Sequence, residues 1–213
     1  MRPNHSRTRV AELIGDKIIR QQLPAGRSIG EVALANELGV SRTPIRDAIR
    51  RIMAEGLIEN APGRGLTVAQ FNMQQVRELY FLRATLEGAA AAQAAQHASP
   101  SELNSMANLL DMSKRSVGNP KETARLNRLF HHAIYDAARN RYLLQALSQM
   151  SDTLALLPGT TFEAPGRPAV ALAEHRELLA AIVERSPERA EQVARTHMQM
   201  ACETRIAMMF RAE

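Results

Sequence analysis

The sequence has no tryptophan, few aromatic residues and a single cysteine. Aromatic residues make up 4% of the 213 residues, whereas hydrophobic residues as a whole make up 45%, an ordinary share for a globular protein. Cys202 has no partner for an intrachain disulfide, which favours a reducing, cytoplasmic location. No stretch approaches the roughly 20 apolar residues that span a bilayer. No apolar segment follows the basic N-terminus, so we expect neither a membrane span nor a signal peptide.

Charge is unevenly distributed along the chain. The formal net charge is +5, from 27 Lys+Arg and 22 Asp+Glu. Residues 1–70 contain 11 basic and 7 acidic residues, so most of the positive excess lies in the first third of the sequence. A basic N-terminal segment favours a polyanionic partner such as DNA.

Helical periodicity dominates the sequence. Apolar residues recur at helical spacing over 8–21, 31–38 and 42–54. The segments 57–60 and 66–69 flank the turn APGRG and predict a β-hairpin, the only strand signal in the chain. Beyond it we expect only helices, over 72–97, 100–117, 121–139, 141–157, 169–185 and 187–211, with a Pro/Gly-rich loop at 158–168.

This order of elements predicts a mainly α protein with two domains. Residues 1–71 have the three short helices and the hairpin of a winged helix-turn-helix, the fold of many DNA-binding domains. Residues 72–213 have the long amphipathic helices of an all-α antiparallel bundle.

The segment 42–54 has one apolar face and one basic face. Arg42, Arg46 and Arg50 recur every four residues opposite the apolar positions. The planar guanidinium of arginine can bond O6 and N7 of guanine in the major groove, and Thr43 can reach a phosphate or a base edge. A row of arginines is also typical of an ordinary solvated helix, but the turn before this segment and the hairpin after it favour DNA binding.

The hairpin turn provides a further cation. Gly63, Arg64 and Gly65 would place one guanidinium on a slim backbone tip. Such a tip can enter the minor groove or lie along the phosphates.

The segment LPAGRSIGEVALANELGVSRTPIRDAIRRIMAEGLIENAPGRGLTV resembles the DNA-binding domain of GntR-family regulators, and the resemblance extends over residues 8–69. It implies that Arg42 and Arg46 contact the operator and that Gly63 and Arg64 enter the minor groove. Val32 stands where some members have an operator-reading arginine, so we expect a different base preference.

Three histidines, His131, His175 and His197, lie on predicted amphipathic helices of the second domain. Asn127 precedes His131 by four residues, so both project from one helical face. Imidazoles from separate helices can converge on a divalent metal, and three of them with one oxygen donor suit zinc or nickel. Histidines on such helices are more often plain packing or surface residues, so spacing alone leaves both interpretations open.

The segments NRLFH, EHRELLAAI and SPERA resemble the FCD ligand-binding domain of the FadR subfamily of GntR regulators, of the VanR-like type, over residues 72–211. The resemblance implies a metal bound by one aspartate and three histidines, here His131, His175 and His197. The acidic position is Asn127, an uncharged and weaker donor. A metal-free polar pocket is therefore the alternative.

The same resemblance implies a small carboxylate effector. Arg83 matches an inward-facing arginine of the first long helix, which would bind the anionic group of the effector. The alternative for Arg83 is an ion pair with Glu87 one turn further along.

Taken together, these patterns predict a homodimeric transcriptional regulator, a repressor rather than an enzyme, that binds a pseudo-palindromic operator in double-stranded DNA and responds to an effector. One alternative is a metal-dependent enzyme fused to a DNA-binding module, since a metal bound by histidines can activate water. The sequence has no HExxH motif to support it. The other alternative is an architectural DNA-binding dimer without an effector.

Overall fold

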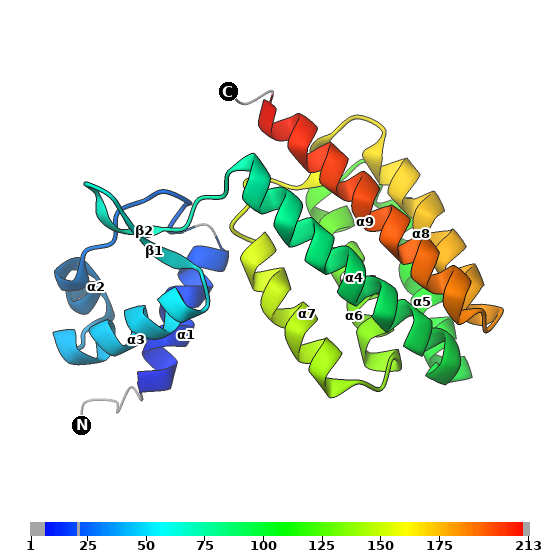
Figure 1. Ribbon diagram of the computed structural model, residues 1–213, viewed down its shortest axis with the longest axis horizontal. Coiled ribbons are helices and arrows are strands. Elements are labelled where there is room, and N and C mark those ends of the chain that lie inside the picture. The colour runs from blue at the N-terminus through cyan, green and yellow to red at the C-terminus, as the bar shows by residue number, and fades with distance from the viewer. Residues whose placement is uncertain (1–6, 21, 211–213) are drawn as a thin grey trace. The chain divides into compact units, whose positions relative to one another are not determined.

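The computed structural model describes residues 7–20 and 22–210 (Figure 1). The chain divides into two compact units, residues 1–71 with 149–158 and residues 72–148 with 159–213. The fold is mainly α, as predicted, with a winged helix-turn-helix at the N-terminal end and a helical bundle after it. None of the described helices combines the length and the apolar content that crossing a membrane requires.

The N-terminal part of the first unit contains three helices followed by a hairpin: α1 (Arg7–Ile19), α2 (Glu31–Leu38), α3 (Arg42–Ala54), β1 (Ile58–Ala61) and β2 (Gly65–Val68). The helices α2 and α3 have the bounds predicted from the sequence. Gly39 ends α2 in the left-handed conformation with φ 64°, and its N–H donates to carbonyls of the last turn. The core of this unit is built from isoleucines of α1 and α3, including Ile14, Ile45 and Ile52.

Each strand of the hairpin lies one residue closer to the turn than predicted. Ile58 pairs with Val68 and Ala61 pairs with Gly65. The strands come this close to the turn because Gly63 and Gly65 have positive φ values of 74° and 70°, which glycine adopts without a steric penalty. A further antiparallel bridge between Ser28 and Thr67, which was not predicted, extends the small sheet.

The second unit is an antiparallel bundle. Its helices are α4 (Met73–His97), α5 (Pro100–Arg115), α6 (Pro120–Ala137), α8 (Arg167–Val183) and α9 (Pro187–Phe210). The helix α7 (Arg141–Leu154) has residues in both units, because the division falls after residue 148. The helices α4 and α9 lie side by side and antiparallel (Figure 1). Small residues permit this close approach, because a Cβ atom on Gly88 of α4 would lie 3.0 Å from Cγ of both Glu191 and Arg195 of α9.

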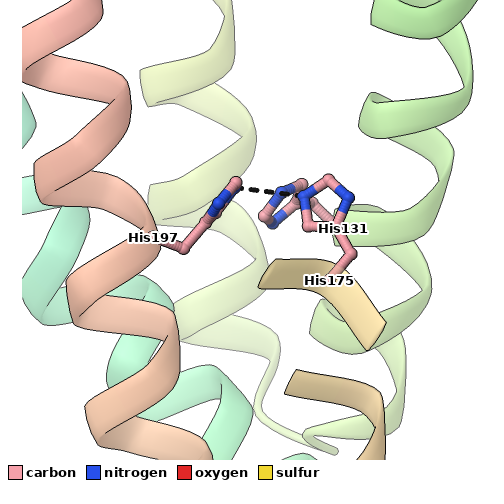
Figure 2. A group of neighbouring side chains, drawn as sticks. All are labelled: His131, His175 and His197. Carbon is pink, nitrogen blue, oxygen red and sulfur yellow. Dashed lines mark hydrogen bonds between the residues drawn. The ribbon is translucent and has the colours of Figure 1, made fainter. Parts of the chain in front are cut away.

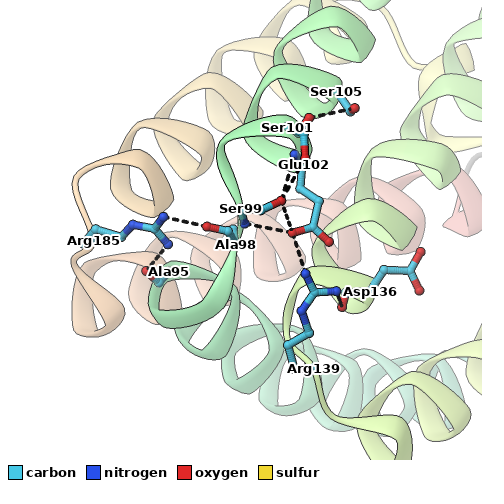
Figure 3. A network of polar contacts seen from close by, with 9 residues as sticks. All are labelled: Ala95, Ala98, Ser99, Ser101, Glu102, Ser105, Asp136, Arg139 and Arg185. Atoms are coloured by element: carbon cyan, nitrogen blue, oxygen red, sulfur yellow. Dashed lines mark hydrogen bonds and ion pairs between the residues drawn. The ribbon is translucent and has the colours of Figure 1, made fainter.

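Local caps fix where α4 ends and α5 begins. Ser99 and Glu102 form a capping box at the start of α5, with Pro100 in the first turn. Arg185 donates to the carbonyls of Ala95 and Ala98 at 3.1 and 2.6 Å, which satisfies the last turn of α4 (Figure 3).

The helix α8 begins at Arg167, two residues earlier than the sequence predicted. Pro168 suggested a loop, but proline is tolerated in the first turn of a helix. The loop before α8 also contains a short 3₁₀ helix, η1 (Thr161–Glu163). As a result Arg167, assigned to a loop from the sequence, is a buried helical residue.

Candidate functional site

The exposed face of α3 has the arginines that the sequence predicted there. Side chains of Ile45, Ile49 and Ile52 are buried, because their spacing places them on the face toward the core. On the other face the side chains of Arg42 and Arg46 are 56% and 53% exposed. Arg50, at 79%, is more exposed still, and Thr43 is exposed in the first turn. The turn of the hairpin presents Arg64 to solvent between Gly63 and Gly65.

Glu31, at the start of α2, contacts both arginines of this face. Its Oε2 accepts a hydrogen bond from Arg46 Nε at 2.8 Å and one from Arg42 at 3.3 Å. The hydrogen bond from Arg46 is the main cause that lowers the pKa of Glu31 below its usual value. Glu31 was not among the predicted site residues, because its partners lie 11 and 15 residues away across a turn.

In the second unit the structure brings three histidines together, His131 from α6, His175 from α8 and His197 from α9 (Figure 2). All three are buried, and one ring nitrogen of each lies within 4.8 Å of the others. The Nε2 atoms of His175 and His197 are 3.1 Å apart. Burial, reinforced by the neighbouring histidines, holds the pKa of His175 and of His197 well below the usual value, so both imidazoles are neutral at pH 7.

The donor set of this histidine centre fits a divalent metal. His131 Nε2 is buried and has no hydrogen-bond partner, an unsatisfied polar atom that a bound metal would satisfy. Tetrahedral zinc with Zn–N bonds of about 2.0–2.1 Å separates its nitrogen ligands by about 3.3 Å, close to the 3.1 Å between Nε2 of His175 and Nε2 of His197. Neutral imidazole is also the form that binds metal.

Two carboxylates contact the outer nitrogens of this centre. Glu87 of α4 lies 2.9 Å from Nδ1 of His131, and Glu174 of α8 accepts from Nδ1 of His197. Glu87 was expected from the sequence only as a partner of Arg83, and Glu174 was not predicted. The one available signal for Glu174 was its position directly before His175.

Asn127 and Arg83 border the centre in different ways. Asn127 lies one turn before His131 on α6 and lines, with His175, a small cavity that also includes Ser113 and Thr123. The Nε of Arg83 donates to Glu87 at 3.0 Å, the ion pair that was the alternative for this residue. The Arg83 side chain is only 15% exposed.

Both units match known protein families. The model of the FCD domain matches residues 78–200, and that of the bacterial regulatory proteins of the gntR family matches residues 6–68. The chain therefore belongs to the GntR family, and it is a DNA-binding transcriptional regulator of the GntR/FCD type.

Individual relatives agree with this assignment. The chain is 29% identical to the HTH-type transcriptional regulator YdhC of Bacillus subtilis, over 84% of this chain and 81% of that protein. It is 23% identical to the HTH-type transcriptional repressor RspR of Escherichia coli, over 88% of this chain and 83% of that protein. The solved structure of E. coli McbR/YncC shares the fold, with a TM-score of 0.75, 24% identity and 97% coverage of both chains.

Proposed function

We propose that the chain is a homodimeric repressor whose affinity for a pseudo-palindromic operator is controlled by a small carboxylate effector, bound beside a divalent metal in the helical unit. The observation that carries the proposal is the buried convergence of three imidazoles in the same chain as a winged helix with outward arginines. The first feature suits ligand binding and the second suits a DNA groove.

In this proposal the exposed face of α3 and the hairpin turn contact DNA. The helix enters the major groove of one half-site, and the turn lies in the adjacent minor groove or along the phosphates. The contacting residues are Arg42, Thr43, Arg46, Arg50, Gly63 and Arg64.

In the helical unit the three histidines would hold the metal, zinc or nickel, with the amide oxygen of Asn127 as a weaker fourth donor. A bound metal would supply a positive centre for a carboxylate oxygen of the effector. The small cavity lined by Asn127 and His175 lies beside the centre. The buried guanidinium of Arg83 adds a cation on the α4 side.

Operator titration tests the DNA part. Arg46→Ala should cost about 1–3 kcal/mol of specific binding if the guanidinium bonds a guanine. Arg51→Ala is the matched control, because Arg51 lies on the same helix, is 52% exposed and pairs with Glu55. Equal weakening on every DNA sequence would make Arg46 a phosphate contact. Absence of any specific complex at physiological salt would contradict operator binding.

Thermal shifts test the effector part. Small carboxylates, screened with and without Zn²⁺, should include some that raise the melting temperature and change operator affinity. His175→Ala should abolish Zn²⁺ binding, which elemental analysis of the purified protein would detect. If no carboxylate changes either quantity, the chain is better described as an architectural DNA-binding dimer.

A further inference from the structure

We propose that Glu87 and Glu174 are positioning residues of the histidine centre, each fixing one imidazole and supplying negative charge that Asn127 cannot. This inference rests on the metal site of the proposed function. It goes further by assigning roles to two carboxylates and two arginines that would not themselves touch the metal.

On the α4 side, Glu87 is 2% exposed and uses both carboxylate oxygens. Its Oε2 lies 2.9 Å from Nδ1 of His131, and its Oε1 accepts from the hydroxyl of Tyr135 at 2.6 Å and from Nε of Arg83 at 3.0 Å. A carboxylate oxygen accepts from an N–H, so this contact places a proton on Nδ1 of His131, and Nε2, which points away from Glu87, has no hydrogen-bond partner.

On the α8 side, Glu174 repeats this arrangement with different residues. Arg167, with a side chain only 5% exposed, donates to both oxygens of Glu174 at 2.8 Å. The same carboxylate accepts from Nδ1 of His197. The proton of His197 is therefore on Nδ1, and its Nε2 has the lone pair that faces His175 at 3.1 Å.

The two sides together form a pair of Arg–Glu–His relays, defined as Arg83–Glu87–His131 and Arg167–Glu174–His197. Each arginine holds a carboxylate in place, and each carboxylate selects the tautomer of one histidine. A carboxylate behind a ligating imidazole makes the imidazole a stronger donor. Three imidazoles and an amide provide no negative charge of their own, so in this chain the anionic groups nearest the centre are Glu87 and Glu174, each paired with an arginine.

The test compares charge-removing variants of the full chain. Glu174→Gln is the first variant, because Glu174 is 18% exposed and the amide oxygen of glutamine can still accept from Arg167. For the other relay, Arg83→Met with Glu87→Gln removes both charges, which avoids leaving a buried arginine unpaired. Glu191→Gln is the matched control, since Glu191 also pairs with an arginine but is 40% exposed on the surface of α9.

Two measurements are made on each variant. Competition with a chelator gives the Zn²⁺ affinity, and ¹⁵N spectra of the metal-free protein give the histidine tautomers. Each relay variant should bind Zn²⁺ about 10–100-fold more weakly, whereas Glu191→Gln should match the wild type. In the wild type His131 and His197 should be protonated at Nδ1. Glu174→Gln should give a mixture of tautomers at His197, because an amide can either accept or donate.

The outcomes separate this inference from the metal site itself. Unchanged tautomers and an unchanged Zn²⁺ affinity in both relay variants would overturn the inference. If the wild type binds no Zn²⁺ but His197 changes tautomer in Glu174→Gln, the positioning role is supported and the metal site of the proposed function is contradicted.

Discussion

Asn127 is the proposed oxygen donor of the histidine centre, and its amide contributes no negative charge. We predict that Asn127→Asp increases the Zn²⁺ affinity by about tenfold or more, about 1.4 kcal/mol, because an anionic oxygen would face the dication at short range in a buried setting. Chelator competition measures the change. Asn119→Asp makes the same substitution at the N-cap of α6, away from the histidines, and should leave the affinity unchanged. An Asn127→Asp protein that binds Zn²⁺ no more tightly would exclude residue 127 from the ligand set.

The carboxylate of Glu31 offsets the positive charge of Arg42 and Arg46 in the DNA-free protein. We predict that Glu31→Gln strengthens binding to random DNA more than binding to the operator. The slope of log K against log salt should steepen by about 0.9 for each extra phosphate contact. Titrations at several salt concentrations measure both effects.

Glu55→Gln is the control for Glu31→Gln, since Glu55 pairs with Arg51 on the same helix α3. If the ratio of operator to random-DNA affinity is the same in the wild type and in Glu31→Gln, Glu31 has no part in specificity.

Residue roles could be predicted where the partners are close in sequence or where a family pattern names them. The histidines were identified in this way, and the structure brings them together. The relay contacts were not identified, because Glu87 and Glu174 meet His131 and His197 across 44 and 23 residues. Such pairings depend on how helices pack, and a single sequence contains no periodicity that reports them.

At the scale of elements, local signals set the limits of what could be predicted. The bounds of α2 and α3 were right because the apolar spacing and Gly39 act within a few residues. The start of α8 was placed too late, because Pro168 was interpreted as a helix breaker although it lies in the first turn. The Ser28–Thr67 bridge was missed because it joins segments that are distant in the sequence.

The capping box of α5 allows a prediction about stability and pH. Glu102 accepts from the backbone N–H of Ser99 at 2.8 Å and from Arg139 at 2.8 Å (Figure 3). The Ser99 backbone bond is the main cause that lowers the pKa of Glu102 in the folded state. Glu102→Ala should lower the free energy of unfolding at pH 7 by about 0.5–1.5 kcal/mol.

The sign of the pH dependence follows from the lowered pKa. The unfolded chain protonates Glu102 near pH 4.3, whereas the folded chain protonates it at a lower pH. The stabilisation is therefore complete above about pH 4.3 and is lost as the pH falls through the folded pKa. Urea unfolding of the wild type and of Glu102→Ala should show the difference shrinking between pH 7 and pH 3. Glu177→Ala, at an exposed position of α8, should show no such trend.

At the scale of the whole molecule, a homodimer should read two half-sites on one face of DNA, about 10–10.5 base pairs or a multiple apart. Inserting five base pairs between the half-sites rotates one of them by about half a helical turn. We predict that this insertion removes most of the specific affinity, because only one recognition helix can then engage. Titration of the two operators under one buffer condition measures the loss. Equal affinity for both would indicate that the binding unit contacts a single half-site.

Regulation by a ligand requires coupling between the two units, and that coupling is reciprocal. If Zn²⁺ changes the operator affinity by some factor, the operator must change the Zn²⁺ affinity by the same factor, typically about 5–150-fold in coupled systems. We predict such equality when the Zn²⁺ affinity is measured with and without saturating operator, and the operator affinity with and without saturating Zn²⁺. Arg46→Ala provides the control, because added operator should not change the Zn²⁺ affinity of a protein that no longer binds the operator. A factor of one in both directions would mean that the histidine centre stabilises the helical unit without signalling to the winged helix.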